Sequence, residues 1–295
     1  MSHFRLLAAM LIAASIAFAA ADRAGAQSRK PKAPPGRDPG GIAIAIVGHG
    51  VNYLRPEIAP RLARDGEGEP IAWDLGDNDN RPIERHADIP TAGSPPGQHT
   101  LLAHLVLREA GASRLVIARR KRGDRDGLAR ATAFAAQTPA RIILLLHESA
   151  FENWELVRHA GAHFRDRLLI VPAHAGPVEE AAAPLPNGLG GDNVIVVTAP
   201  LAERRLGPAA WAVQGADIAA PSFMPLAAAN PSPGPETAAA RIAALAARLL
   251  AAEPQLEGAG LKARIVALAK PAEATPAASG HPPVIAEPHR PFRTE

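Results

Sequence analysis

The sequence predicts an α/β protein in which a mostly parallel central sheet carries helices on both faces, giving three layers. Short, continuous runs of branched apolar residues are typical of strands that are buried on both faces. Segments with apolar residues at helical spacing lie between these runs, and such alternation produces parallel strands. The expected strands are residues 42–47, 114–118, 142–146, 168–171 and 194–197.

Helices are expected between these strands and again after the last one. The apolar spacing indicates helices at residues 101–110, 127–137, 151–163, 237–252 and 260–269. The helix at 237–252 consists almost entirely of Ala, Leu and Ile, with Arg241 and Arg248 as its charged residues. Because this helix is apolar nearly all round, we expect it to run through the core rather than over it.

The composition excludes several classes of function. The chain has 295 residues, of which 47% are hydrophobic and 21% charged, so we expect it to fold despite its 30 prolines. A net charge of +3 and an aromatic content of 4% do not favour binding to nucleic acid through basic stripes and stacking rings. Since the chain has no cysteine, disulfides, a thiol nucleophile and thiolate metal sites are excluded, and we expect no cofactor.

Residues 1–26 have the pattern of a secretory signal peptide. His3 and Arg5 precede an apolar run at 6–20, and an A-x-A cleavage site follows at 24–26. The run is shorter than the roughly 18 to 20 residues that a transmembrane anchor needs. We therefore expect an exported bacterial protein, periplasmic or extracellular, with no stable membrane insertion after the signal is removed.

The remaining chain divides into one expected domain with a segment on each side. Residues 27–41 are basic and rich in Pro and Gly, which predicts a flexible linker. The expected folded domain is 42–270. Residues 271–295 are rich in Pro and Ala and lack an apolar period, which predicts a disordered tail.

Several segments of the expected domain, in order, resemble motifs of the subtilases, the subtilisin-like serine proteases. Residues 44–58 (IAIVGHGVNYLRPEI) resemble the first-strand motif, in which an apolar strand leads into Asp-Ser/Thr-Gly. Residues 97–106 (GQHTLLAHLV) resemble Gly-His-Gly-Thr-His-Val-Ala-Gly-Ile-Ile without a gap, and residues 234–250 (GPETAAARIAALAARLL) resemble Gly-Thr-Ser-Met-Ala-Ala-Pro-His-Val-Ala-Gly. The resemblance implies a subtilisin-like three-layer fold. Further matching segments are 141–148, 170–176 and 193–222.

The resemblance also implies four catalytic positions, and this sequence has none of the expected residues there. The family's aspartate position falls on Gly48, its histidine on Gln98 and its serine on Glu236, while the oxyanion asparagine falls on Ala175. Glycine has no carboxylate to orient an imidazole, and a neutral amide cannot act as a general base. We therefore expect a catalytically inactive pseudoprotease that binds or scaffolds an unidentified peptide or protein.

Two catalytic alternatives stay open at this point. A one-residue shift in both motifs would make His99 the general base and Thr237 the nucleophile. This shift breaks the small and apolar matches of both helices, and the aspartate is still missing. The other alternative is an atypical hydrolase that uses Glu236 with the neighbouring histidines.

Four histidines adjoin the aligned positions: His49, His99, His147 and His174. The resemblance places His147 and His174 at glycine positions in the two walls of the substrate pocket, where imidazoles would fill or reshape it. Neutral imidazoles together with Glu236 could bind zinc. Their long spacing matches no local zinc motif, so we expect satisfied polar residues and no metal site.

Residues 119–125 (RRKRGDR) form the strongest local charge cluster. Such a run directly after a strand is most often a solvated turn. The alternative is contact with an acidic partner or an anionic membrane surface.

Overall fold

The computed structural model describes residues 40–84, 96–147, 152–173, 186, 188–199, 215–222, 233–271 and 282–289. The predicted signal peptide and nearly all of the predicted linker lie outside these residues. Among the residues that are described, no helix combines the length and apolarity needed to cross a membrane.

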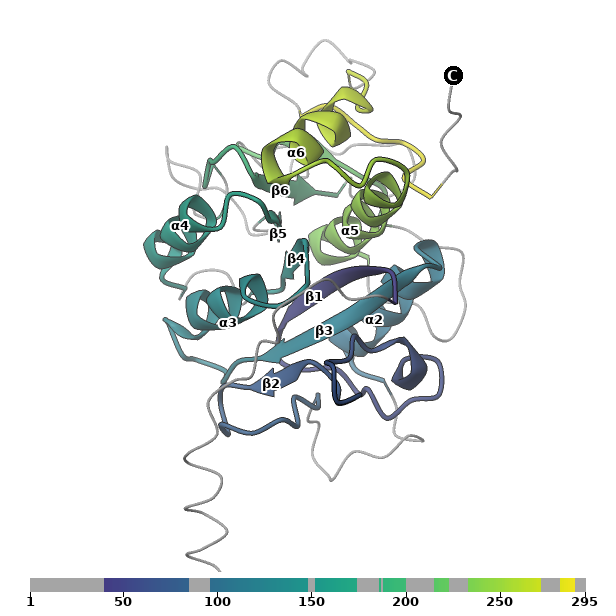
Figure 1. The fold of residues 1–295 in the computed structure, drawn as a ribbon. Coiled ribbons are helices and arrows are strands. Elements are labelled where there is room, and N and C mark those ends of the chain that lie inside the picture. The colour runs from purple at the N-terminus through teal and green to yellow at the C-terminus, as the bar shows by residue number, and fades with distance from the viewer. Residues whose placement is uncertain are drawn as a thin grey trace, which may run out of the picture.

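The middle layer is a seven-stranded sheet with the order β2-β3-β1-β4-β5-β6-β7 (Figure 1). All of its pairings are parallel, which confirms the predicted fold class. The three-residue β2 and the two-residue β7 correspond to none of the predicted strands, because they are too short to form an apolar run. The strands are β1 (Ile42–Gly48), β2 (Ala72–Asp74), β3 (Ser113–Arg119), β4 (Ile142–Leu145), β5 (Leu168–Pro172), β6 (Val194–Thr198) and β7 (Ile218–Ala219).

Helices cover both faces of the sheet, as predicted (Figure 1). Ile44 and Ile46 of β1 belong to one core cluster with the apolar side chains of α2, α5 and α6. The alternate residues Ala43 and Ala45 belong to a second cluster with those of α3 and α4, because successive side chains of a strand point to opposite faces. The helices are the short 3-10 turn η1 (Ala59–Arg61), α2 (Gln98–Glu109), α3 (Gly127–Ala136), α4 (Trp154–His163), α5 (Pro235–Ala252) and α6 (Gly258–Ala267).

Helix α5 runs through the core, as its all-round apolar sequence predicted. It packs against β1, β4, β5 and β6 and against α2. Its buried residues run from Thr237 to Leu250 with few interruptions. Arg241 is buried among them and donates to Glu109 of α2 and to the carbonyl of Pro221, which satisfies its charge and hydrogen-bonding groups.

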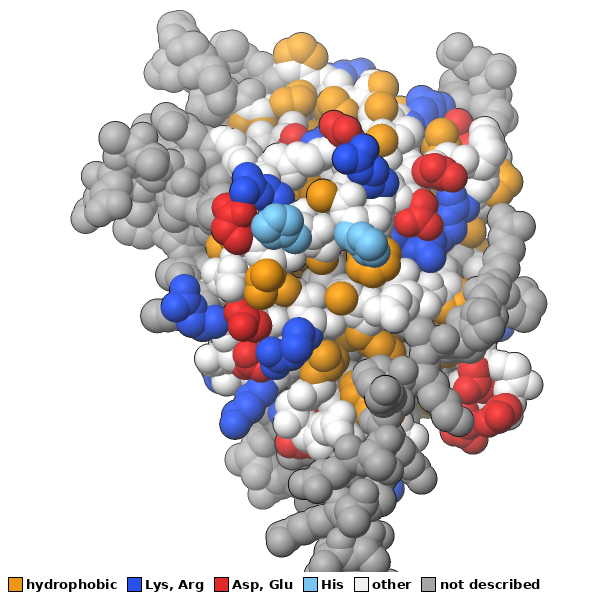
Figure 2. Space-filling view, turned by 60° about the vertical axis from the view of Figure 1, so that its left-hand side comes forward, with side chains coloured by type: hydrophobic (Ala, Val, Ile, Leu, Met, Phe, Trp, Pro, Cys, Tyr) orange, Lys and Arg blue, Asp and Glu red, His pale blue; other side chains and the backbone are white. Residues whose placement is uncertain are grey.

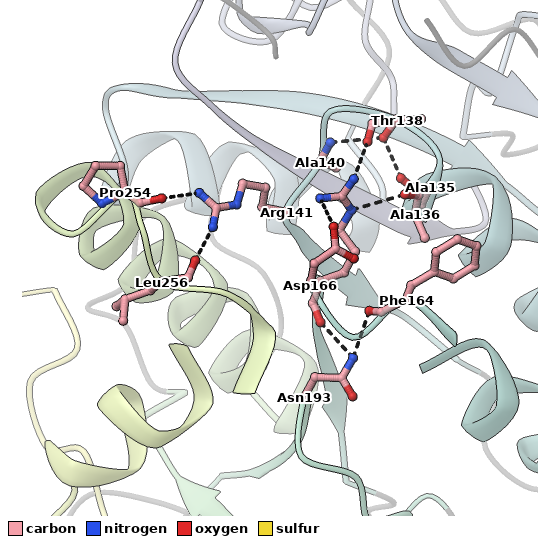
Figure 3. A network of polar contacts seen from close by, with 11 residues as sticks. Ala135, Ala136, Thr138, Ala140, Arg141, Phe164, Asp166, Asn193, Pro254 and Leu256 are labelled. Carbon is pink, nitrogen blue, oxygen red and sulfur yellow. Dashed lines mark hydrogen bonds and ion pairs between the residues drawn. The ribbon is translucent and has the colours of Figure 1, made fainter. Parts of the chain in front are cut away.

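A polar network ties the loops at the amino ends of β4, β5 and β6 (Figure 3). Arg141, just before β4, donates to the carbonyls of Pro254 and Leu256 after α5. The amide of Asn193, just before β6, donates to the carbonyls of Phe164 and Arg167. These bonds fix the edge of the sheet that lies opposite the candidate site described below.

Part of the predicted disordered tail packs on the domain, which corrects that expectation for residues 282–289. Val284 forms bridges with Ala219 of β7 and with Lys270, and Ile285 is buried in the main core cluster. A single apolar pair between prolines gives no helical or strand period, so the sequence pattern could not indicate this contact. Residues 272–281 and 290–295 lie outside the described part.

The charge cluster at 119–125 is only partly the solvated turn that its sequence predicted. Lys121 and Arg122 are exposed, but the Arg120 side chain is only 1% exposed and pairs with Glu152 at 2.6 Å. The backbone N–H of Arg120 still donates to the carbonyl of Gly48, so this residue continues the sheet instead of entering the turn. Elsewhere, acidic and basic side chains alternate with apolar ones on the face seen in Figure 2.

Candidate functional site

The candidate site lies at the carboxyl edge of the sheet, where the first turns of α2 and α5 meet. Gln98 is the first residue of α2, and Glu236 lies in the first turn of α5. The Gln98 Nε2 donates to Glu236 Oε2 at 3.5 Å. The carboxyl edge of a parallel sheet is the usual place for ligand sites in α/β proteins. The structure therefore brings together two of the positions that the sequence motifs singled out.

The ring of His99 occupies the space beside Gly48, the last residue of β1. A Cβ atom added to Gly48 would lie 2.7 Å from Cε1 and 2.8 Å from Nδ1 of His99, and 3.2 Å from Cβ of Leu146. Real Cβ atoms do not approach other heavy atoms so closely, so no larger residue fits here while the ring stays in place. Gly48 and His99 are thus coupled by packing.

His99 is held as a neutral imidazole of one tautomer. Its Nδ1 accepts a hydrogen bond from the backbone N–H of His49 at 3.0 Å, so the single ring proton lies on Nε2. The two imidazoles are stacked with centroids 5.3 Å apart. Burial, with a smaller contribution from the charges of His49, Arg120 and Arg122, lowers the pKa of His99 to about 3.

The N-terminus of α2 is capped by Glu84, a residue that the sequence analysis did not identify. The helix follows Gly97, which has no side chain to accept from its first N–H groups. The carboxylate of Glu84 accepts from the N–H of His99 at 3.1 Å and from that of Thr100 at 3.0 Å. The Thr100 hydroxyl also donates to Glu84 and accepts from the N–H of Asn52. The one sequence signal for this contact is Gly97, because a helix that follows a glycine needs an acceptor from elsewhere in the chain for its first N–H groups.

Glu236 has an environment that favours its protonated form. Burial raises the pKa of the Glu236 carboxyl, the hydrogen bond from Gln98 lowers it in part, and the negative charge of Glu84 raises it again. The next residue, Thr237, has no exposed surface. The carboxyl group therefore faces the site, and the adjacent hydroxyl is buried in the core.

His147 connects the ends of two neighbouring strands. It follows β4, and its Nε2 lies 2.7 Å from the carbonyl oxygen of Pro172, the last residue of β5. Because a carbonyl only accepts, Nε2 carries the proton in this contact. The ring also packs edge-on against Trp154, with centroids 4.9 Å apart. The other two positions named for this region, His174 and Ala175, lie outside the described residues.

A buried ion pair, Arg120 with Glu152, follows the carboxyl end of β3. The side chains of Arg120 and Glu152 are 1% and 3% exposed. Because Glu152 directly precedes Asn153, the N-cap of α4, the pair connects the end of β3 to the start of α4. No sequence pattern indicated this pair, because its members are 32 residues apart and one of them lies in a strongly charged run. Within the described part of the chain, no group of three or more His, Cys, Asp and Glu side chains could hold a metal ion.

Comparisons with known proteins find similar structures but no matching sequence family. No protein-family model matches the chain, and no curated protein matches it. A cold-adapted subtilisin-like serine proteinase has a similar structure, with a TM-score of 0.62 and 15% identity over 87% of this chain and 92% of that one.

Fervidolysin from Fervidobacterium pennivorans, a keratinolytic enzyme related to subtilisin, is also similar. Its TM-score is 0.60 and its identity 13%, over 86% of this chain and 43% of that one. Both likenesses concern the arrangement of the backbone, which agrees with the parallel sheet and the two helical layers described above. The chain therefore has the α/β fold of the subtilisin-like serine proteinases.

Proposed function

We propose that the chain is an exported, catalytically inactive relative of the subtilisin-like proteinases that binds a peptide or a partner protein. The observation that carries this proposal is the pairing of Gln98 with Glu236 at 3.5 Å. A serine proteinase needs a base in hydrogen-bond contact with its nucleophilic hydroxyl. Here the two groups that meet are an amide, which cannot accept a proton from a hydroxyl, and a carboxyl.

The environment of His99 also supports an inactive site. In a catalytic triad the carboxylate accepts from Nδ1 of the histidine, which leaves Nε2 free to take the proton of the nucleophile. In this chain Nδ1 of His99 is itself an acceptor, from the N–H of His49, so Nε2 is already protonated. The alternative nucleophile Thr237 is fully buried. These contacts do not favour the alternative in which His99 is the general base and Thr237 the nucleophile.

A second candidate is a hydrolase in which Glu236 acts as a general acid or base. The raised pKa of Glu236 favours it, because a carboxyl with a raised pKa can exchange a proton closer to neutral pH. The remaining components of such a mechanism, an activated nucleophile and a donor for the oxyanion, are not identified in the described part of the site. We rank this candidate below binding.

A labelling and hydrolysis experiment separates these functions. Purified wild-type protein is treated with a fluorophosphonate probe and, separately, with casein, and both labelling and hydrolysis should be absent. The matched control is Glu236→Ser, which places a hydroxyl opposite Gln98 and should also remain unlabelled because no base is present. Labelling of the wild type would overturn the proposal, and casein hydrolysis that is lost in Glu236→Gln would favour the second candidate.

A further inference from the structure

Residues 282–289, which we call the C-terminal strap, lie along the outer edge of β7 and beside α5 (yellow in Figure 1). The N–H of Ala219 donates to the carbonyl of Pro283 at 2.8 Å, and the N–H of Ile285 donates to the carbonyl of Ala219 at 2.9 Å. On its other side, Val284 exchanges both backbone hydrogen bonds with Lys270. The strap therefore extends the sheet by one short parallel segment beyond β7.

The side chains of the strap are buried at intervals of three residues. Pro282, Ile285 and Pro288 are buried, and Glu287 and His289 are exposed. Val284 pairs along the sheet edge, and the chain then bends at Ala286 and turns at Pro288 and His289 toward α5. Ile285 is 6% exposed and belongs to the main core cluster, so it is the apolar anchor of the segment.

Two arginines of α5 bind the far end of the strap. Arg248 donates to the carbonyls of Pro288 and His289, the latter at 2.9 Å. Arg241, two turns earlier on the helix, donates to Nδ1 of His289 at 2.8 Å and is held in place by Glu109. Because a guanidinium only donates, Arg248 selects a backbone that presents carbonyl acceptors toward α5, and Arg241 selects an acceptor nitrogen on a side chain.

We propose that the edge of β7, Lys270 and the two arginines form a recognition groove for an extended, proline-flanked peptide, and that the strap is its ligand supplied by the same chain. Backbone pairing along a sheet edge, pockets for regularly spaced side chains and a clamp on exposed carbonyls are the features by which proteins bind extended and proline-rich peptides. All contacts of the strap described above are non-covalent. A peptide with the same pattern can therefore replace it, and the residues of this groove are different from Gln98 and Glu236.

Amide hydrogen exchange on the full-length protein tests whether the strap opens separately from the fold. Arg248→Ala removes the clamp without altering the sheet, and the matched control is Arg264→Ala, an exposed arginine of α6 that pairs with Glu253. In Arg248→Ala, exchange at Ile285 and Lys270 should accelerate at least tenfold while β5 amides keep their wild-type rates. Equal rates in the two variants, or acceleration shared with β5, would overturn the proposal.

A fluorescent peptide of residues 280–292 tests exchange of the ligand. Full-length Ile285→Asp, whose own strap lacks its apolar anchor, should bind this peptide saturably in an anisotropy titration. The wild type should bind it at least tenfold more weakly because its groove is occupied, and a scrambled peptide should not bind. If Ile285→Asp does not fold, Arg248→Ala replaces it in the same titration. Failure of both variants to bind, or equal binding of the scrambled peptide, would contradict the proposal.

Discussion

Replacing Gly48 by alanine tests whether the His99 ring occupies the space beside the end of β1. The new Cβ would lie 2.7 Å from the ring, so either the ring or the strand must move. Overpacking of this kind costs about 1–3 kcal/mol. Alanine also gains about 0.5–1 kcal/mol over glycine in a strand, because the unfolded chain has less freedom to lose. We therefore expect Gly48→Ala to lower the free energy of unfolding by about 1 kcal/mol, the two ranges together allowing about 0–2.5 kcal/mol.

The same substitution in a His99→Ala background isolates the contact. Without the ring, the nearest neighbour of the new Cβ is Leu146 at 3.2 Å, and the substitution should be neutral or slightly stabilising. The coupling energy of the double-mutant cycle should then be about 1–3 kcal/mol. Urea unfolding with an unchanged m value measures it as shifts of the midpoint. An equal effect of Gly48→Ala in both backgrounds would show that His99 does not fill this space.

Further predictions concern the charged and titratable groups around the site. Glu84→Ala leaves buried N–H groups of α2 without an acceptor and should cost about 1–3 kcal/mol in denaturant unfolding, more than Glu84→Gln, and equal costs would contradict its capping role. The ring of His99 should stay neutral with its proton on Nε2 from pH 8 down to about pH 5 in nitrogen NMR spectra, because its pKa is lowered to about 3, and an imidazolium signal at pH 5 would refute this. The raised pKa of Glu236 means that the folded state holds its proton more tightly, so wild-type stability falls as pH rises through the unfolded pKa of about 4.3 toward the folded one. Glu236→Gln should therefore stabilise the protein more at pH 7 than at pH 4, and a pH-independent difference would oppose the assignment. Arg120→Met alone should cost about 3–5 kcal/mol because it leaves Glu152 buried and unpaired, whereas Arg120→Met with Glu152→Leu should cost much less in thermal unfolding.

The sequence allowed the fold and part of the site to be predicted for one physical reason, the regularity of buried strands and helices. The long apolar runs placed β1, β3, β4, β5 and β6, because strands buried on both faces have little choice of residue type. The motif positions Gln98 and Glu236 do meet, since both lie in the first turns of helices that start at the same edge of the sheet.

The remaining features depend on contacts between residues that are far apart in sequence. The orientation of His99 is fixed by the N–H of His49, which is 50 residues away in the sequence. Helix α2 is capped by Glu84, which lies 15 and 16 residues before the two N–H groups that it accepts from. Arg120 is buried because Glu152 meets it, although its own neighbours are charged. No local pattern encodes such pairs, so a sequence read segment by segment predicts the elements but not these polar contacts.

The most direct test of binding without catalysis is incubation of the wild-type protein with a random peptide library. Bound and unbound fractions are both analysed by mass spectrometry for sequence enrichment and for new termini. We predict that the bound fraction is enriched in particular sequences and that its peptides are recovered at full length, with no new termini in either fraction. Peptides with new termini that appear with the wild type and disappear with Glu236→Gln would contradict the account.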